Sequence, residues 1–271
     1  MSKINFHQTF PPTLEYLSRL LEITNMAEEI TKEDISKKTG IPTGEISGKV
    51  EPHIDYAIFM GLIVNISETK GKYKLICTSL GNIIKSEDIG LREEITQLVC
   101  HSRLTSLATG APLWRYITRY IMPKYPRGIK TILLEDELRK TPDFATGKIK
   151  IGAFYSTYIK SFEAFSLLTK EKDILRVVPQ LYKNELLYVY AYSLLYEWEQ
   201  IYKNTNEISS EQLEKLKVTG VFGFNDAMLY QILELLSEKS IIKINGQLSP
   251  FTIIKISSSE VVQNSLYSLL Y

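Results

Sequence analysis

The chain has 271 residues, of which 44% are hydrophobic and 23% are charged, and its formal net charge is +1 at pH 7. This composition is typical of a water-soluble globular protein and excludes a chain that is drawn to polyanions by its overall charge. No run of about 18 apolar residues occurs, so we expect no membrane span. The two isolated cysteines, Cys77 and Cys100, predict a reducing, cytoplasmic location without a disulfide framework.

A leucine-rich helix is expected over residues 13–26, and a winged helix over residues 31–84. Thr31 and Asp34 have the spacing of a capping box, with Asp in place of the usual Glu, so a short helix should begin there. Gly40 stands where a helix can end in a left-handed residue.

A second helix is expected to follow and to end at Gly61, because Pro42 suits a first helical position and apolar residues then recur at helical spacing; Thr43 or Ser47 could cap it. Two β-prone runs, residues 62–66 and 73–77, should form a hairpin, and a further helix should end near Ile84. Two short helices joined by a glycine-containing turn form a helix-turn-helix, whose second helix can enter the major groove of DNA.

The DNA contacts predicted for this segment come from the second helix and from the hairpin. The candidate residues are Thr43, Ser47 and Lys49 on the helix and Lys70, Lys72 and Lys74 on the hairpin. The same helix also carries acidic side chains that would repel phosphates, namely Glu45, Glu51 and Asp55. Because winged helices also serve as dimerisation and protein-docking modules, both interpretations stay open.

Charge is unevenly distributed along the chain. Residues 115–183 carry 14 Lys and Arg against 7 Asp and Glu, whereas residues 1–114 have a net charge of −2 and residues 184–271 of −4. Basic residues alternate there with tyrosines, as a surface that follows a phosphate backbone requires. The candidates are Arg115, Arg119, Lys124, Arg127, Lys130, Lys148 and Lys150. The alternative is a solvated helix face over a tyrosine-rich core. On the first interpretation, we expect these residues to share one exposed face with the hairpin lysines.

Further helices are expected in the middle of the chain, joined by a connector over residues 171–181. Their ranges are about 91–107, 111–121, 133–139, 148–165 and 184–202.

The end of the chain repeats the pattern of the beginning. A short helix opens at Ile208, a turn follows over residues 217–223, and Asn225 caps a helix that runs to about Lys239. Two strands around Asn245-Gly246 then form a hairpin. We therefore predict a mostly α (α+β) protein with a winged helix at each end. Its parts are residues 1–110, the basic helical middle 111–205, and the C-terminal module 206–271.

No motif of catalysis or of cofactor binding is present. The sequence lacks a Gly-rich phosphate loop, a paired Cys/His metal spacing and a Gly-x-Ser-x-Gly elbow. His7 and His101 are candidates for a base or a ligand, but a structural role in the core is the default interpretation. We therefore predict no catalytic residue, no metal and no cofactor.

Short motifs along nearly the whole chain resemble an uncharacterised bacterial domain-of-unknown-function family (DUF4007-like). They are Phe6-His7-Gln8-Thr9-Phe10, Thr78-Ser79-Leu80-Gly81, Asp88, His101, Ala111-Pro112-Leu113-Trp114 and Phe222-Gly223-Phe224. The chain departs from the family's opening motif at Phe6 and Gln8, where the family shows Gly and Glu. The family is commonly encoded beside PAPS-reductase-like enzymes in DNA-modification and phage-defence loci, so the resemblance implies a defence-associated DNA-binding or adaptor protein.

Three hypotheses follow from the sequence. The first is a non-enzymatic DNA-binding protein of such a system, and the second is an adaptor that docks other proteins of the same locus. The third is an enzyme that uses His7 or His101. The sequence leaves the oligomeric state open.

Overall fold

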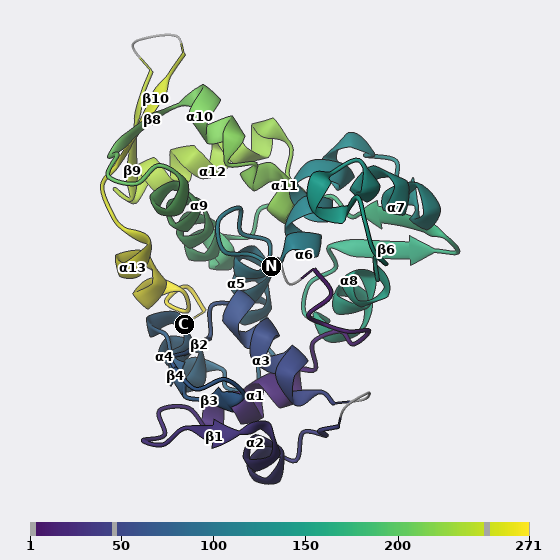
Figure 1. Cartoon of the computed structure of the whole chain (residues 1–271). Helices are drawn as coiled ribbons and strands as arrows, with labels where there is room; N and C mark the ends of the chain where they lie inside the picture. Colours follow the sequence, from purple (N-terminus) through teal and green to yellow (C-terminus); the bar gives the residue numbers. More distant parts are fainter. Residues whose placement is uncertain (1–3, 45–47, 247–249, 271) are drawn as a thin grey trace.

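The computed structural model describes residues 4–44, 48–246 and 250–270 and shows a mixed α and β fold (Figure 1). The N-terminal elements lie at the bottom of the view, the middle elements at the right and the C-terminal elements at the upper left. Among the described residues, no helix is both long and apolar enough to span a membrane.

The N-terminal part alternates helices with short strands. Its elements are α1 (Leu14–Glu22), β1 (Ile30–Thr31), α2 (Lys32–Thr39), α3 (Val50–Phe59), β2 (Ile63–Asn65), β3 (Lys72–Tyr73), β4 (Leu75–Cys77) and α4 (Ser79–Glu87). The capping box between Thr31 and Asp34 is confirmed, and Gly40 ends α2 with a left-handed φ of 69°. The predicted hairpin is also confirmed: β2 pairs with β4, while β3, one residue before β4, pairs with β1.

The second helix begins at Val50 and not at Pro42, so its predicted start was wrong. Two glycines explain the difference, because each glycine inside a helix costs about 1 kcal/mol relative to alanine. Gly44 and Gly48 both fall in this stretch and approach closely: a Cβ on Gly48 would lie 2.5 Å from the Gly44 carbonyl oxygen. The chain therefore loops before α3.

The middle part contains strands that the sequence did not reveal. Its elements are α5 (Glu94–Leu104), α6 (Pro112–Tyr116), the π-helical turn η1 (Ile117–Ile121), η2 (Met122–Lys124), β5 (Ile129–Lys130), α7 (Thr131–Arg139), η3 (Pro142–Phe144), α8 (Gly152–Ser156), the π-helical turn η4 (Thr157–Ser161), β6 (Leu168–Glu171), β7 (Ile174–Val177), η5 (Asn184–Leu186) and α9 (Leu187–Ile201). The helix expected over residues 148–165 is limited to α8 and η4, and the expected connector 171–181 contains β7.

The missed strands form an antiparallel sheet in the order β5-β7-β6. Lys172 has a left-handed φ of 57° in the tight turn between β6 and β7. Such hairpin turns are usually recognised by Asn-Gly or Asp-Gly, and this turn has neither signature.

The C-terminal part repeats the order of the N-terminal part. Its elements are β8 (Glu207–Ser209), α10 (Ser210–Lys215), α11 (Val218–Phe222), α12 (Asp226–Glu238), β9 (Ile242–Asn245), β10 (Thr252–Lys255), α13 (Ser259–Val262) and η6 (Gln263–Ser265). Ser209 and Gln212 form a capping box at the position that Thr31 and Asp34 occupy in the first part. Asn225 caps α12 as predicted, but the expected turn over residues 217–223 is the short helix α11.

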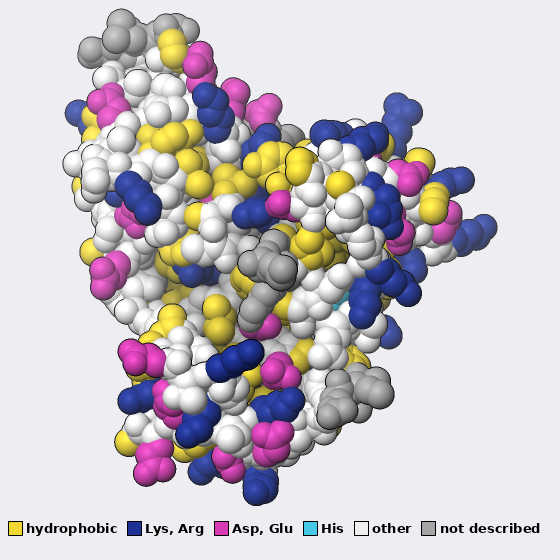
Figure 2. Space-filling model, viewed as in Figure 1, with side chains coloured by type: hydrophobic (Ala, Val, Ile, Leu, Met, Phe, Trp, Pro, Cys, Tyr) yellow, Lys and Arg dark blue, Asp and Glu magenta, His cyan; other side chains and the backbone are white. Residues whose placement is uncertain are grey.

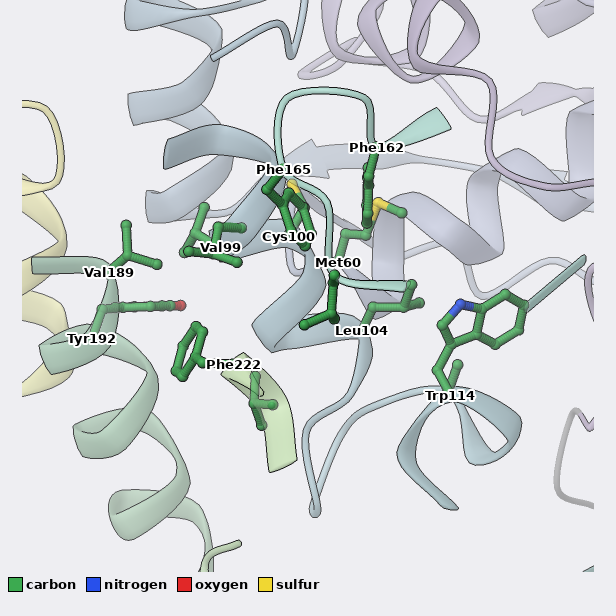
Figure 3. Close-up of a cluster of buried hydrophobic side chains, with 14 of the residues drawn as sticks. Met60, Val99, Cys100, Leu104, Trp114, Phe162, Phe165, Val189, Tyr192 and Phe222 are labelled. Carbon is green, nitrogen blue, oxygen red and sulfur yellow. The ribbon is translucent and has the colours of Figure 1, made fainter. Parts of the chain in front are cut away.

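Helix α5 lies at the centre of the buried core (Figure 3). Val99, Cys100 and Leu104 of α5 are surrounded by side chains from all three parts of the chain. The surrounding residues labelled in the figure are Met60, Trp114, Phe162, Phe165, Val189, Tyr192 and Phe222. One hydrophobic cluster thus joins the two ends and the middle and fixes how the surface elements lie relative to one another.

Candidate nucleic-acid interface

The outer face of the β5-β7-β6 sheet is basic. Ile129 of β5 and Leu175 of β7 are register partners and are buried, so the residues that alternate with them, Lys130 and Arg176, lie on the opposite, solvent-facing side. The Arg176 guanidinium donates from Nε to the carbonyl oxygen of Arg127 at 3.2 Å, which places the two arginines side by side. Two exposed cations, Lys130 and Arg176, thus lie on this face, and the exposed Arg127 follows in the turn beside it.

Further exposed basic residues surround this sheet. They are Lys124, Arg139, Lys140, Lys148, Lys160, Lys170 and Lys172. Figure 2 shows Lys and Arg side chains gathered over α7 and β6 at the right of the view. Glu137 pairs with both Lys124 and Lys140, and these contacts hold the pKa of its carboxyl below the usual range. Within the described residues, no carboxylate lies within ion-pair distance of Arg127, Lys130 or Arg176.

Lys148 and Lys150 lie beside the N-terminal arm. The Asn5 side chain donates from Nδ2 to the Lys148 carbonyl at 2.7 Å. The positive charge of Lys150 lowers the pKa of His7, although burial of the imidazole is the larger cause. These two lysines therefore form a second part of the basic surface, anchored to the arm.

Arg119 does not belong to the interface, contrary to the prediction from its basic neighbours. Its side chain is 1% exposed. It donates to the carbonyls of Thr105 and Leu216, both at 2.6 Å, and forms an ion pair of 3.0 Å with Glu197. A guanidinium held in this way joins the end of α5, η1, α9 and the end of α10 and cannot reach a phosphate in the folded chain.

Arg115 is half-buried and also serves the fold. Its guanidinium donates to the Leu107 carbonyl at 2.9 Å and lies 5.2 Å from the centre of the Tyr116 ring. These contacts correspond to the alternative interpretation of this segment, a helix face packed over a tyrosine-rich core.

The hairpin lysines lie far from the basic sheet. Figure 1 places β3 at the lower left and β6 at the right, so the expected single face that would combine them does not form. Lys70 and Lys72 are exposed and Lys74 is half-buried, but acidic side chains accompany them. Tyr73 donates to Glu51 at 3.1 Å, and Glu29 accepts the Glu68 N–H at 3.1 Å. The hairpin surface is therefore mixed in charge.

The residues predicted on the second helix precede that helix. Thr43 and Lys49 lie in the loop before α3, and Ser47 is outside the described residues. The Lys49 ammonium lies 5.2 Å from the centre of the Phe10 ring and 5.8 Å from that of Tyr16. Lys49 thus faces the N-terminal arm, and neither described residue projects from a recognition helix.

All three histidines are buried. His101 contacts the Tyr158 hydroxyl at 2.9 Å and the Val221 carbonyl at 2.7 Å, so it is the satisfied core histidine that we expected. Neither ring nitrogen of His7 has a hydrogen-bond partner among the residues that the structure describes, and the ring packs edge-on against Trp114. Burial lowers the pKa of both imidazoles to about 4 and keeps them neutral at pH 7. Within the described residues, no group of three or more His, Cys, Asp and Glu is arranged to hold a metal ion.

Sequence reasoning missed Lys170, Lys172 and Arg176. The sequence carries little signal for this strand pair, because residues 169–173 are all polar or charged and Ile174 is directly followed by Leu175. Strict alternation of apolar and polar residues, which is typical of a half-buried strand, is therefore missing.

The fold is similar to that of SspB. Two crystal structures of SspB, one of them with bound magnesium ion, superpose with TM-scores of 0.78 and 0.76. Sequence identity is 15% and 14%, and both comparisons cover 100% of this chain and 88% of the SspB chain. No protein-family model matches the sequence, and neither does any curated protein. At this identity the likeness establishes a shared fold, while the resemblance to the domain-of-unknown-function family depends on its short motifs.

Proposed function

We propose that this chain is a non-enzymatic DNA-binding protein of a DNA-modification or phage-defence system. The observation that supports DNA binding is the group of exposed, unpaired cations Arg127, Lys130 and Arg176 on the outer face of the middle sheet. The motif resemblance supports the type of system.

Binding on this face is electrostatic and independent of base sequence. Each cation that neutralises a phosphate releases a condensed counterion, so affinity falls steeply as salt rises. The sheet presents Lys130 and Arg176 on paired strands, and Lys148 and Lys150 extend the surface toward the arm. These cations lie on strands and in a turn and not on a recognition helix, so we expect contacts to the DNA backbone to dominate over contacts to the bases.

Fluorescence anisotropy with a labelled duplex across a salt series tests this proposal. A triple variant, Arg127→Gln, Lys130→Gln and Arg176→Gln, should bind more weakly and reduce the slope of log K against log salt by up to about 3, since each phosphate contact contributes about 0.9. A matched triple variant on the hairpin, Lys70→Gln, Lys72→Gln and Lys74→Gln, should change the slope much less. Absence of any binding by the wild-type chain at low salt would end the proposal.

We further propose that the two end modules are winged helices. In the N-terminal module, β1 and two helices precede β2, β3 and β4, and β1 pairs with β3, which leads into β4. In the C-terminal module, β8 and three helices precede β9 and β10, and β8 pairs with β10. In both modules a strand before the helices pairs with a strand after them, as is typical of that motif. In this proposal β1 and β8 are integral to their modules. Hydrogen exchange should therefore protect the backbone amides of both strands together with their partners, and rapid exchange of either strand would contradict the assignment.

A second candidate function is that of an adaptor, and the C-terminal module favours it. A recess of about 130 Å³ between α10 and α12 is lined by Leu213, Leu229 and Phe251, and the Tyr230 side chain beside it is 46% exposed. Co-purification with the products of neighbouring genes tests this function. Tyr230→Ala should weaken that co-purification, and a chain that elutes alone from such a preparation would count against it.

A further inference from the structure

A recess lies where the N-terminal module, α5, α9 and α13 meet, on the side of the molecule away from the basic sheet. Its volume is about 230 Å³. In Figure 1, α4 and α13 lie at the left of the view, whereas β6 and α7 lie at the right. The recess is therefore separate from the proposed DNA interface.

Arg103 of α5 is the cation of this recess, and its guanidinium is fixed in place without a counterion. The guanidinium carbon lies 3.5 Å from the centre of the Tyr196 ring, which stacks against Tyr192. The only hydrogen bond recorded for its side chain within the described residues is a long one, 3.4 Å, from Nη1 to the Tyr192 hydroxyl. Nε is buried, and no described residue is its hydrogen-bond partner. No carboxylate of the described residues lies within ion-pair distance.

The position of Gly61 shows how tightly the guanidinium is held. A Cβ on Gly61 would lie 2.7 Å from Nε of Arg103 and 2.9 Å from Nη2, so any other residue would push the arginine away. An arginine with unsatisfied donors, confined in this way, is arranged for an oxygen-rich ligand.

Backbone donors reach the same recess from the first turn of α4, a helix of nine residues. The Thr78 hydroxyl donates to the Gly61 carbonyl at 2.6 Å and accepts the N–H of Gly81 at 2.8 Å, so it satisfies one donor of the helix terminus. The N–H groups of Ser79 and Leu80, which both line the recess, have no partner within the helix. The positive end of the helix dipole adds to the charge of the arginine.

We propose that this recess binds a phosphate group, with Arg103 as its principal ligand. The guanidinium supplies charge and donors, and the α4 terminus and the Tyr192 hydroxyl supply further hydrogen bonds. The group can belong to free phosphate or a nucleotide, or to the backbone of DNA. Because the bound anion contacts α4, α5 and α9 together, it also ties the N-terminal module to the rest of the chain.

Glu260 limits how tightly an anion binds. Its side chain is exposed and lines the same recess from α13, so it repels a phosphate held there. Removal of its charge should therefore strengthen binding, while removal of the Arg103 charge should weaken it. The two changes act in opposite directions, which a general loss of folding does not produce.

The test is calorimetric titration of the full chain with inorganic phosphate, a 5′-nucleoside monophosphate and a short single-stranded oligonucleotide. Arg103→Met should weaken binding of the phosphate-bearing probe by about 10- to 100-fold, as expected for the loss of a charge-assisted contact. Glu260→Gln should strengthen it by about threefold. Arg92→Met, which removes an exposed positive charge outside the recess, is the matched control and should have little effect.

Arg103-dependent binding of phosphate or of the nucleotide supports a small-molecule source, and Arg103-dependent binding of the oligonucleotide alone supports DNA as the source. If no probe distinguishes Arg103→Met from wild type, the site is refuted. Should Arg103→Met fail to fold, Glu260→Gln decides: tighter binding supports the site and unchanged binding overturns it. The triple variant of the basic sheet should leave phosphate binding intact, so failure of the proposed DNA interface is distinguishable.

Discussion

Replacement of Arg119 by methionine should destabilise the protein without weakening DNA binding directly. The guanidinium donates three hydrogen bonds within the core, to Thr105, Leu216 and Glu197. Glu197 is itself 1% exposed, and its second carboxylate oxygen accepts the Leu107 N–H at 3.0 Å. Burial lowers the pKa of the Arg119 guanidinium, and the Glu197 charge opposes that shift and keeps the pair ionic.

The expected loss is large because Arg119→Met leaves a buried carboxylate without its cation. Breaking one partner of a buried ion pair typically costs about 3–5 kcal/mol of unfolding free energy. The double variant Arg119→Met with Glu197→Met removes both charges and keeps apolar volume, so it should recover most of that loss. Lys124→Gln, an exposed basic change in the same segment, should alter stability by no more than about 0.5 kcal/mol.

Urea denaturation followed by circular dichroism measures these differences, and DNA binding is measured on the folded fraction of each variant. The reasoning fails if Arg119→Met unfolds at the wild-type urea concentration while DNA affinity falls. That result would mean that the guanidinium is exposed in solution. An equal loss of stability in the single and the double variant would instead show that the lost packing, and not the unpaired carboxylate, dominates.

Two further predictions concern stability. Burial lowers the folded-state pKa of His7, His53 and His101 to about 4 from an ordinary 6.5. Between pH 6.5 and pH 4 the unfolded chain therefore binds more protons than the folded chain, so the unfolding free energy falls as the pH falls. Unfolding free energy measured in urea at pH 7.5 and pH 5 should drop by about 2 kcal/mol for each histidine, and a constant value would contradict the burial of the imidazoles. Gly81→Ala should destabilise by about 1–3 kcal/mol or more, because its Cβ would lie 1.9 Å from the Leu62 carbonyl oxygen. Gly152→Ala, whose Cβ would lie 3.7 Å from the Tyr155 hydroxyl, is the matched control; equal thermal midpoints for the two variants would refute the steric argument.

Features with local causes could be predicted from the sequence. The capping box at Thr31, the left-handed Gly40 and the Asn225 cap each depend on residues within one helical turn, and all three are present. The start of the second helix was misplaced because the favourable Pro42 was given more weight than Gly44 and Gly48, which follow it. Local signals therefore fail where two of them conflict over the same few residues.

The exposure of the basic residues could not be predicted, because it depends on helix phase and on distant elements. Arg119 falls in the π-helical turn η1, where side chains no longer follow the 3.6-residue period that sequence reasoning assumes. Its acid, Glu197, comes from α9 and is separated from it by 78 residues. The same charge pattern therefore contains one core residue, Arg119, and one exposed neighbour, Lys124, that look equivalent in the sequence.

The repeated element order of the two end modules, together with their charge, argues for a division of roles. Both modules begin with a strand that leads into a capped helix and end with an antiparallel pair, yet neither presents a purely basic surface. The C-terminal segment is net acidic, and in the N-terminal module Glu29 and Glu51 lie beside the hairpin lysines. The unpaired cations lie instead on the middle sheet, which neither module contains. We therefore expect a polyanion to be attracted to the middle of the chain, and we propose that the end modules contact other proteins.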